Sequence, residues 1–234
     1  MKVDKIIFRM SLLTVVCLCV FSCFSCGNDD GLSAPRIESV WTNMSTQPIE
    51  QVACSYPQQT ICLRGSGFSG VDKLNVNGME IDLTDKKIYN TDNSIIIALP
   101  QEVATTTSTG LAYLQVENGA GEAVYEPFYV FGSSEKPKIS GFSSTTLTAG
   151  STLTIKGSNL GGAVEVYLPL AFDQKVLCGF DESKASSDTE IYVVVPEEVT
   201  FAQGQVAIVM HKTYAPTGDE YTETAYSDVT NFSN

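Results

Sequence analysis

Short runs in which apolar and polar positions alternate recur along the chain from residue 35 onward. Ile61 and Leu63 alternate with Cys62 and Arg64, and residues 152–156 repeat the pattern. Successive side chains of a strand point to opposite faces, so this period of two predicts strands with one buried face. No stretch beyond residue 25 combines a helical apolar stripe with capping residues. The pattern therefore predicts an all-β protein.

Other runs refine this expectation. Residues 95–99 (IIIAL) and 191–195 (IYVVV) are apolar at every position, which predicts more deeply buried strands. The dipeptides Asn77-Gly78 and Asn118-Gly119 lie between alternating runs, where they favour tight hairpin turns.

Four landmarks occur twice in the same order. Residues 92–103 (DNSIIIALPQEV) return as 188–199 (DTEIYVVVPEEV), with Asp, Ile, Pro, Glu and Val at identical spacing. The other pairs are PRIESV with PKISGF, TICLRGSGF with TLTIKGSNL, and YEPFYVF with YSDVTNF. The order predicts a tandem duplication of about 100 residues, the size of one β-sandwich.

The two copies are expected at residues 35–132 and 137–234, joined by a short linker. The difference in residue number between the two copies of a landmark changes from one landmark to the next, and these changes locate the loops that differ in length. The first copy has a longer segment at residues 41–59, and the second copy has a longer segment before its last landmark, around residues 214–221. In an immunoglobulin-like sandwich these are the A–B and F–G segments, which we expect to meet at the junction between the domains.

The N-terminus carries a targeting signal. Three basic residues precede an uncharged stretch at residues 10–28, whose apolar core is short for a membrane span. A secretory signal peptide at residues 1–25 is therefore favoured over an uncleaved anchor.

The stretch ending at Cys26 resembles a bacterial lipobox, in which a small residue precedes the acylated cysteine. Cys23 follows a serine too, but Asn28, Asp29 and Asp30 directly after Cys26 resemble the acidic export tag of Bacteroidetes surface lipoproteins. The resemblance implies lipidation at Cys26 and a lipidated acidic tether at residues 26–34. It places the protein at the outer membrane, lipid-anchored and facing outside the cell.

The charge balance argues against one class of partner. The full chain has a net charge of −13, and loss of residues 1–25 would leave 11 basic and 26 acidic residues, a net charge of −15. Nucleic-acid affinity comes largely from Lys and Arg contacts to phosphates. We therefore expect no DNA or RNA partner.

Three cysteines follow the lipobox. Cys54 and Cys62 lie on either side of the turn-like Tyr56-Pro57, so in an oxidising compartment they could form a disulfide. Cys178 would then be a small buried residue. No cysteine and histidine spacing indicates zinc, and no calcium loop is present, so we expect no metal or cofactor.

The opening of the second copy resembles an IPT/TIG domain. The matching positions are Pro137, Ile139, Gly150, Leu153, Ile155, Gly157 and Leu160. The first copy matches at Pro35, Ile37, Ile61, Leu63, Gly65 and Phe68, while Gln58 replaces the first glycine. The resemblance implies two tandem immunoglobulin-like β-sandwiches.

Lipid-anchored tandem IPT/TIG chains are similar to surface glycan-binding proteins of Sus-type uptake systems. The resemblance implies a non-enzymatic accessory in glycan capture, with polysaccharide or a TonB-dependent transporter complex as partner. In that family the tandem is a spacer, and a further domain binds the sugar. The alternative is therefore a structural spacer or protein-interaction module without its own carbohydrate site.

Catalytic residues are scarce. His211 is the only histidine, so a Ser-His-Asp triad would have to use it, and a solvated position at a strand end is the simpler expectation. Neighbouring acids such as Glu197-Glu198 and Asp219-Glu220 point apart on a strand, which indicates solvated surface. The sequence predicts no enzyme.

Four aromatic residues occupy the longer segments: Trp41, Tyr56, Tyr214 and Tyr221. An aromatic face can stack on a sugar ring, and a tyrosine hydroxyl adds a hydrogen bond. The same rings could instead cover the domain junction. A sugar site at this place requires a cleft between the domains, whereas a spacer requires a sealed junction.

The lipobox assignment makes a direct prediction. Cys26→Ala should accumulate as an unprocessed precursor, because the cut depends on the acylated thiol, whereas Cys23→Ala should still be lipidated. Incorporation of a labelled fatty acid measures both. Normal acylation of the Cys26→Ala protein would remove the assignment.

Overall fold

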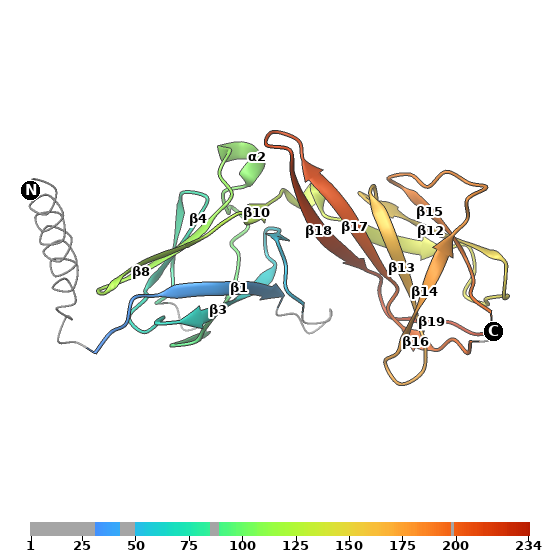
Figure 1. Cartoon of the computed structure of the whole chain (residues 1–234), viewed down its shortest axis with the longest axis horizontal. Coiled ribbons are helices and arrows are strands. Elements are labelled where there is room, and N and C mark those ends of the chain that lie inside the picture. Colours follow the sequence, from blue (N-terminus) through green and yellow to red (C-terminus); the bar gives the residue numbers. More distant parts are fainter. Residues whose placement is uncertain (1–30, 43–49, 85–88, 198) are drawn as a thin grey trace, which may run out of the picture.

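The computed structural model describes residues 31–42, 50–84, 89–197 and 199–234. Two β-sandwiches lie end to end along its long axis (Figure 1). The predicted all-β class is confirmed. The predictions for the signal peptide, Cys26, Asn28, Asp29 and Asp30 fall outside the described residues.

The first sandwich is built from two four-stranded sheets. One has the order β1-β3-β7-β6 and the other β5-β4-β8-β9, which are the A-B-E-D and C′-C-F-G orders of an immunoglobulin fold. Strands β2 and β10 form a separate parallel pair. The strands are β1 (Arg36–Thr42), β2 (Cys54–Ser55), β3 (Thr60–Ser66), β4 (Lys73–Val76), β5 (Met79–Asp82), β6 (Tyr89–Thr91), β7 (Ser94–Ala98), β8 (Leu114–Asn118), β9 (Gly121–Tyr125) and β10 (Tyr129–Val130).

The second sandwich has one continuous strand order, β11-β12-β15-β14-β13-β17-β18. Strand β14 crosses between the layers, since its first four residues pair with β13 and its last two residues pair with β15. Strands β16 and β19 pair separately. The strands are β11 (Lys138–Phe142), β12 (Thr152–Ser158), β13 (Ala163–Pro169), β14 (Lys175–Phe180), β15 (Glu190–Val194), β16 (Gln203–Gly204), β17 (Ala207–Tyr214), β18 (Asp219–Tyr226) and β19 (Thr230–Asn231).

Each sandwich has its own apolar core. The first core extends from Val40 to Val130 and the second from Ile139 to Phe232. Cys178 is buried in the second core, as predicted for a small apolar residue. Between the sandwiches lies a single turn of 3₁₀ helix, η1 (Ser133–Glu135).

The fully apolar runs differ from expectation. Ile95 and Ile97 of β7 are buried, but Ile96 between them is only half-buried. In β15, Ile191 and Val193 are buried, whereas Tyr192 is half-buried. One face of each strand therefore packs on the core, while the other lies on the outer face of an open sheet.

A repeated glycine shows why the two copies share a landmark. A Cβ atom on Gly65 would lie 1.8 Å from the carbonyl oxygen of Arg36, and one on Gly157 would lie 2.1 Å from that of Lys138. Both positions face the same irregularity, a register shift of the first strand against the second. Only glycine allows the two backbones to approach this closely.

Local turn chemistry agrees with the sequence. Asn77 and Gly78 both have positive φ values, 51° and 88°, and join β4 to β5 in the predicted hairpin. A short α-helix, α2 (Thr106–Thr109), is capped by the Thr105 side chain and ends at Gly110, which has a φ of 73°.

The backbone contact at Gly157 can be tested. Gly157→Ala should lower the free energy of unfolding by about 1–3 kcal/mol, because the added methyl group collides with the Lys138 carbonyl. Gly141→Ala is the matched control, since a Cβ there meets nothing within 4 Å. Thermal unfolding followed by circular dichroism should show a lower melting temperature for the first variant alone; equal melting temperatures would contradict the contact.

Candidate functional site

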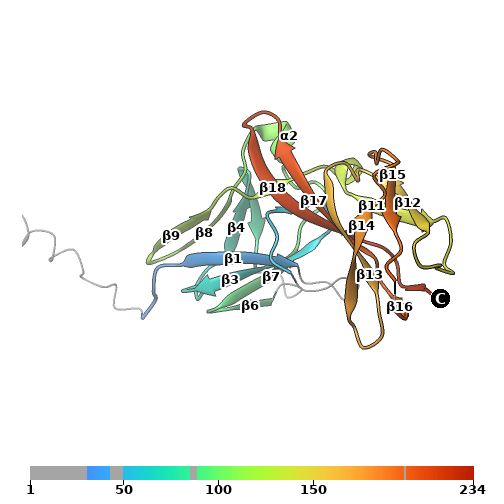
Figure 2. The ribbon, with the colours of Figure 1, turned by 45° about the vertical axis from the view of Figure 1, so that its right-hand side comes forward.

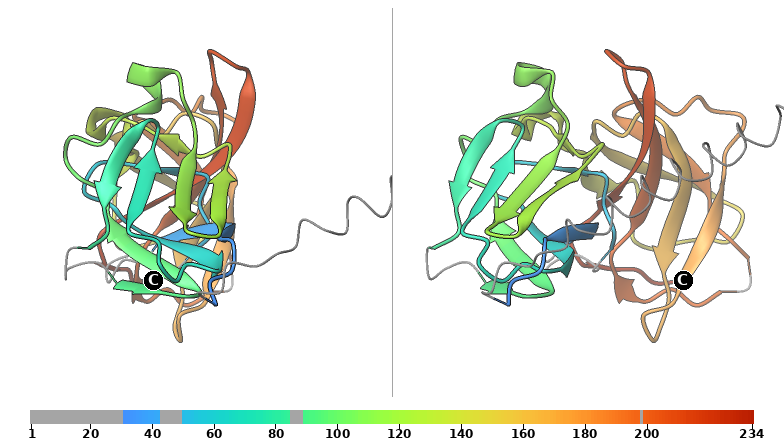
Figure 3. Two further views of the ribbon diagram at one scale, coloured as in Figure 1. Left: turned by 90° about the vertical axis from the view of Figure 1, so that its left-hand side faces the viewer. Right: turned by 60° about the vertical axis from the view of Figure 1, so that its left-hand side comes forward.

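The junction between the domains is occupied by one long hairpin. Strands β17 and β18 pair over eight residues each and turn at Gly218, whose φ is 78°. In Figure 3 the hairpin stands between the two sandwiches, and in Figure 2 its tip reaches the level of α2. The predicted meeting of the A–B segment of one domain with the F–G segment of the other is therefore seen.

Tyrosine hydroxyls form hydrogen bonds across the junction. Two belong to the first domain: Tyr56 donates to Glu223 Oε1, and Tyr129 donates to Asp219 Oδ2 at 3.0 Å. Two belong to the second domain: their bonds are Tyr214 to the Thr106 carbonyl at 3.4 Å and Tyr226 to Glu50 Oε2 at 2.8 Å. The contact is thus reciprocal, with donors on both sides.

Beneath these bonds lies an aromatic cluster, which we call the junction cluster. Its buried members are Cys54, Tyr56, Tyr129 and Phe131, and the half-buried Ala112, Tyr214 and Tyr221 pack against them. The Tyr129 ring centroid lies 5.2 Å from that of Tyr214 and 5.3 Å from that of Tyr221. Phe131 and Tyr221 stack at 5.5 Å. Pairs of this kind contribute about 0.5–1.5 kcal/mol each beyond their buried area.

A buried ion pair lies beside the cluster. Lys212 Nζ is 3.1 Å from Glu223 Oε2, and the two side chains are 18% and 7% exposed. Among the described residues, Lys212 supplies the ammonium group that pairs with Oε2, which accepts no other hydrogen bond from them. Lys212 also donates to the Asn159 carbonyl at 3.1 Å. Removal of one member of such a pair is costly, about 3–5 kcal/mol, because the other charge stays buried.

Burial keeps the groups around Glu223 protonated. It raises the pKa of the Cys54 thiol, and the negative charge of Glu223 adds to the effect. Burial also raises the pKa of Tyr56, with smaller contributions from Cys54 and Glu223. The Tyr56 phenol therefore remains a donor to the carboxylate over the physiological pH range.

At the lower edge of the junction, burial raises the pKa of Glu50 above its ordinary value of 4.5, although the hydrogen bond from Tyr226 opposes the shift. The folded state then holds this proton more strongly than the unfolded chain. The contribution of Glu50 to stability therefore falls as pH rises past 4.5 through its raised folded pKa.

The linker is fixed as well. Asn159 donates from Nδ2 to the carbonyls of Ser134 and Lys136, at 2.8 and 3.1 Å. Lys136 places its ammonium group 5.8 Å from the centre of the Tyr56 ring. The turn between the domains is thus bonded to the second domain and contacts the first.

The space left in the junction is small. A cavity of about 100 Å³ lies beside Tyr56 and Glu223, well below the roughly 300 Å³ of the smallest ligand pockets. A shallow open groove of about 420 Å³ runs along the outer edge and is lined by Gln51, Tyr125 and Tyr221, among others. Among the described residues, the centre of the junction is therefore sealed, and the open space lies along its edge.

The structure brings together three of the four predicted aromatic residues: Tyr56, Tyr214 and Tyr221. Trp41 lies apart on the outer face of β1, where its Nε1 donates to Ser39 Oγ at 2.8 Å and the Arg64 guanidinium lies 4.7 Å from its ring centre. It is absent from the junction cluster because Val40, its neighbour, takes the core-facing position.

Several junction residues were missed by sequence reasoning: Tyr129, Phe131, Lys212, Glu223 and Tyr226. Tyr129 and Phe131 belong to the last landmark of the first copy, which the repeat alone assigns to a core strand. The apolar run YEPFYVF carries two more aromatic residues than its counterpart YSDVTNF, and this excess is the signal that could have identified them.

The predicted Cys54–Cys62 disulfide is not formed, and both cysteines are free and buried. Cys54 lies in β2, which pairs with β10, and its side chain joins the junction cluster. Cys62 lies on the outer face of β3, between Trp41 of β1 and Ile96 of β7. The two strands carry their thiols into different surroundings.

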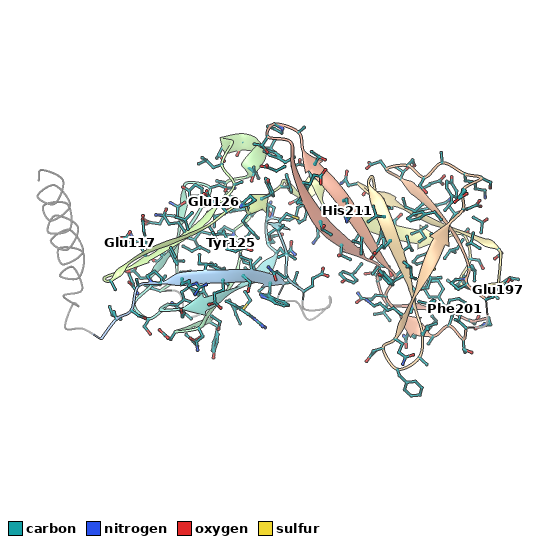
Figure 4. The ribbon with its side chains drawn as sticks, in the orientation of Figure 1. Glu117, Tyr125, Glu126, Glu197, Phe201 and His211 are labelled. Atoms are coloured by element: carbon teal, nitrogen blue, oxygen red, sulfur yellow. The ribbon has the colours of Figure 1, made fainter. Side chains whose placement is uncertain are left out.

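The acid and histidine positions form no common site. His211 is exposed on β17, and Figure 4 shows Glu197 at the far side of the same domain. Asp219 accepts hydrogen bonds from Tyr129 and Thr217, while the adjacent Glu220 is exposed. Within the described ranges, no group of three or more His, Cys, Asp or Glu residues is placed to hold a metal ion. In that same part of the chain, no helix is long and apolar enough to cross a membrane.

Comparison with known proteins supports the resemblance seen in the second copy. Residues 137–222 match the family model of the IPT/TIG domain. This segment runs from the residue before β11 into β18 and so covers most of the second sandwich. No match to the chain was found among curated proteins.

Among solved structures, the chain is similar to surface glycan-binding proteins. PbSGBP-B from Prevotella bryantii aligns with 16% identity and a TM-score of 0.36, over 82% of this chain and 41% of that one. SGBP-B from a complex xyloglucan utilization locus in Bacteroides uniformis aligns with 18% identity and a TM-score of 0.32, over 86% and 50%. The chain thus spans half or less of the length of these proteins.

The hydroxyl of Tyr56 provides a test of the junction. Tyr56→Phe should lower the free energy of unfolding by about 1–3 kcal/mol, because the buried Glu223 carboxylate loses a donor. Tyr89→Phe, on a side chain that is 59% exposed, is the matched control and should change it by less than about 0.5 kcal/mol. Denaturant unfolding measures both, and equal midpoints for the two variants would show that the hydroxyl contributes nothing.

Proposed function

We propose that this chain is a rigid, non-enzymatic arm of a surface apparatus for glycan capture, with its two domains held in one orientation. The observation that carries the proposal is the sealed junction. Tyrosine hydroxyls and an aromatic cluster join the two domains, and the Glu223 carboxylate that accepts from Tyr56 is held on the second domain by its ion pair with Lys212.

Rigidity is a specific property of this junction. Domains joined by a short linker move relative to one another by default, unless a large apolar interface holds them. Here the apolar contact is supplemented by the Glu223 carboxylate, which is satisfied only when Tyr56 and Lys212 both reach it. An arrangement that moves the domains apart leaves Glu223 paired with Lys212 but removes the Tyr56 donor from the buried carboxylate, and the loss of that hydrogen bond is costly.

The place of the arm in the cell follows from the N-terminal sequence. A chain acylated at Cys26 and exported through Asn28, Asp29 and Asp30 would stand on the outer membrane with its domains outside. Several acyl chains hold a protein firmly to a membrane, at about 0.8 kcal/mol per buried CH₂. The IPT/TIG match of the second sandwich supports a tandem spacer of the Sus-type kind.

The expected partners are polysaccharide and a TonB-dependent transporter complex. We propose that Tyr56 and Tyr214 serve the structure of the arm and do not contact sugar, a role supported by their place in the junction cluster and by their hydrogen bonds. Carbohydrate contact by this chain would then use another surface.

Small-angle X-ray scattering tests the rigidity. The native protein should give a single narrow distribution of distances, whereas the double variant Tyr214→Ala/Tyr221→Ala should give a larger radius of gyration and a broader distribution, because the cluster that joins the domains is lost. Circular dichroism should show that the double variant keeps the strand content of the native protein.

The control is Val124→Ala/Leu177→Ala, which removes two side chains that are 49% and 53% exposed on the sheets. Its scattering should match that of the native protein. Unchanged scattering of the Tyr214→Ala/Tyr221→Ala variant would overturn the proposal of a locked arm.

A further inference from the structure

A second hollow lies on the second domain, outside the junction cluster. Its wall on one side is the loop between β13 and β14, which projects from the lower end of the domain in Figures 1 and 2. Its other wall is β16 with the segment that leads to β19. The volume is about 600 Å³, within the range of ligand pockets.

The tip of the β13–β14 loop carries an unusual residue. Phe172 is 95% exposed, the highest value among the large apolar side chains of the described residues. Phe172 and Asp173 have φ values of 59° and 57°, and the Gln174 N–H donates to the Ala171 carbonyl at 3.4 Å. Two positive φ values define a type I′ turn, which favours Asn-Gly. A phenylalanine there is strained by its positive φ and gains nothing from burial. It therefore conflicts with the residue preference of the turn and with the tendency of large apolar side chains to be buried.

The lining of the hollow is rich in amides. Gln174 and Gln203 are exposed and Gln205 is half-buried, and Gln205 donates from Nε2 to the Ser227 carbonyl at 2.9 Å. An amide both donates and accepts hydrogen bonds, as do the hydroxyl groups of a sugar. Val229, which is 60% exposed, adds apolar surface.

The charges of the lining balance. Asp173 and Lys175 are its only charged residues, so the hollow is neutral in a chain whose net charge is −13. A polyanion would find one ammonium group in an acidic protein, and a cation would find one carboxylate. A neutral, hydroxyl-rich ligand fits this lining better than either.

The hollow is also connected to the first domain, through Tyr226. The Lys175 ammonium group lies 5.1 Å from the centre of the Tyr226 ring, and the hydroxyl of Tyr226 donates to Glu50 of the first domain. A ligand in the hollow would therefore be held in a fixed place relative to both domains.

We propose that this hollow, together with Phe172 at the tip of the adjoining β13–β14 loop, binds a neutral polysaccharide chain. The ring of Phe172 stacks on the C–H face of one sugar, and the amides bond the hydroxyl groups of the next. The ligand class rests in part on the glycan-capture role proposed above, while the position of the site rests on the residues of the hollow alone.

Affinity electrophoresis of the full chain tests the site. The detergent carries no sugar headgroup, so that it does not compete for the site. The gels contain one neutral polysaccharide each: β-glucan, xylan, mannan, arabinan or amylopectin. At least one polysaccharide should retard the native protein. For the Phe172→Asn variant, the polysaccharide concentration that gives the same retardation should be at least tenfold higher. Asparagine adopts a positive φ readily, so the melting temperature should stay the same or rise.

Tyr89→Ala is the matched control, because it removes an aromatic side chain that is 59% exposed on the other domain, and it should bind as the native protein does. Loss of binding in Gln51→Ala with full binding in Phe172→Asn would overturn the proposal and place the sugar in the groove at the junction edge. No retardation by any polysaccharide would also overturn the proposed sugar site. The proposal of a locked arm would then still be tested by small-angle X-ray scattering. A photo-crosslinker at position 172 that captures a neighbouring envelope protein would then identify the ring as a protein anchor.

Discussion

The carboxylate of Glu223 is the constraint on which the arrangement of this protein depends. It is buried where two domains meet, and its partners come from both of them: the phenol of Tyr56 and the ammonium group of Lys212. Apolar contacts between aromatic rings tolerate small shifts, because dispersion is not directional. A buried carboxylate tolerates much less, since its hydrogen bonds have narrow ranges of length and direction, and loss of the Tyr56 donor leaves a buried oxygen without that bond. The aromatic cluster thus supplies attraction, and Glu223 selects one orientation.

Much of the fold could be predicted because it follows from local rules. The alternation at Ile61 and Leu63 depends only on which face of a strand is buried, and the Asn77-Gly78 hairpin depends only on a turn that needs positive φ. The duplication also carried information, since Gly65 and Gly157 keep the same backbone contact in both copies. The apolar runs around Ile96 and Tyr192 were less informative. Composition alone does not distinguish a strand covered on both faces from one whose outer face stays half open.

The site was predicted in part, for a physical reason. The longer segments of the two copies indicated where the domains meet, and Tyr56, Tyr214 and Tyr221 are indeed found there. Glu223 and Lys212 have the sequence pattern of charges on an exposed strand, and the sequence does not show that Tyr56 of the other domain packs against Glu223. Trp41 was assigned to the junction from its position in the chain, but strand parity places its ring on the outer face. The Cys54–Cys62 pairing failed similarly, because nearness in sequence does not reveal that β2 leaves β3 to pair with β10.

The two domains are connected twice, once by the covalent linker and once by the contacts of the junction. These two parallel connections determine how the molecule carries a mechanical load. A protein tethered to a membrane at one end and engaged at the other is stretched whenever the cell moves against its surroundings. The five residues 132–136 can extend to about 18 Å at most. They are held well short of free motion by Asn159 and by the packed domains. A pulling force along the long axis therefore reaches the tyrosine contacts first, and these share it among several bonds. Only after these contacts separate does the covalent linker take the full tension, so the junction and the linker bear a load in sequence.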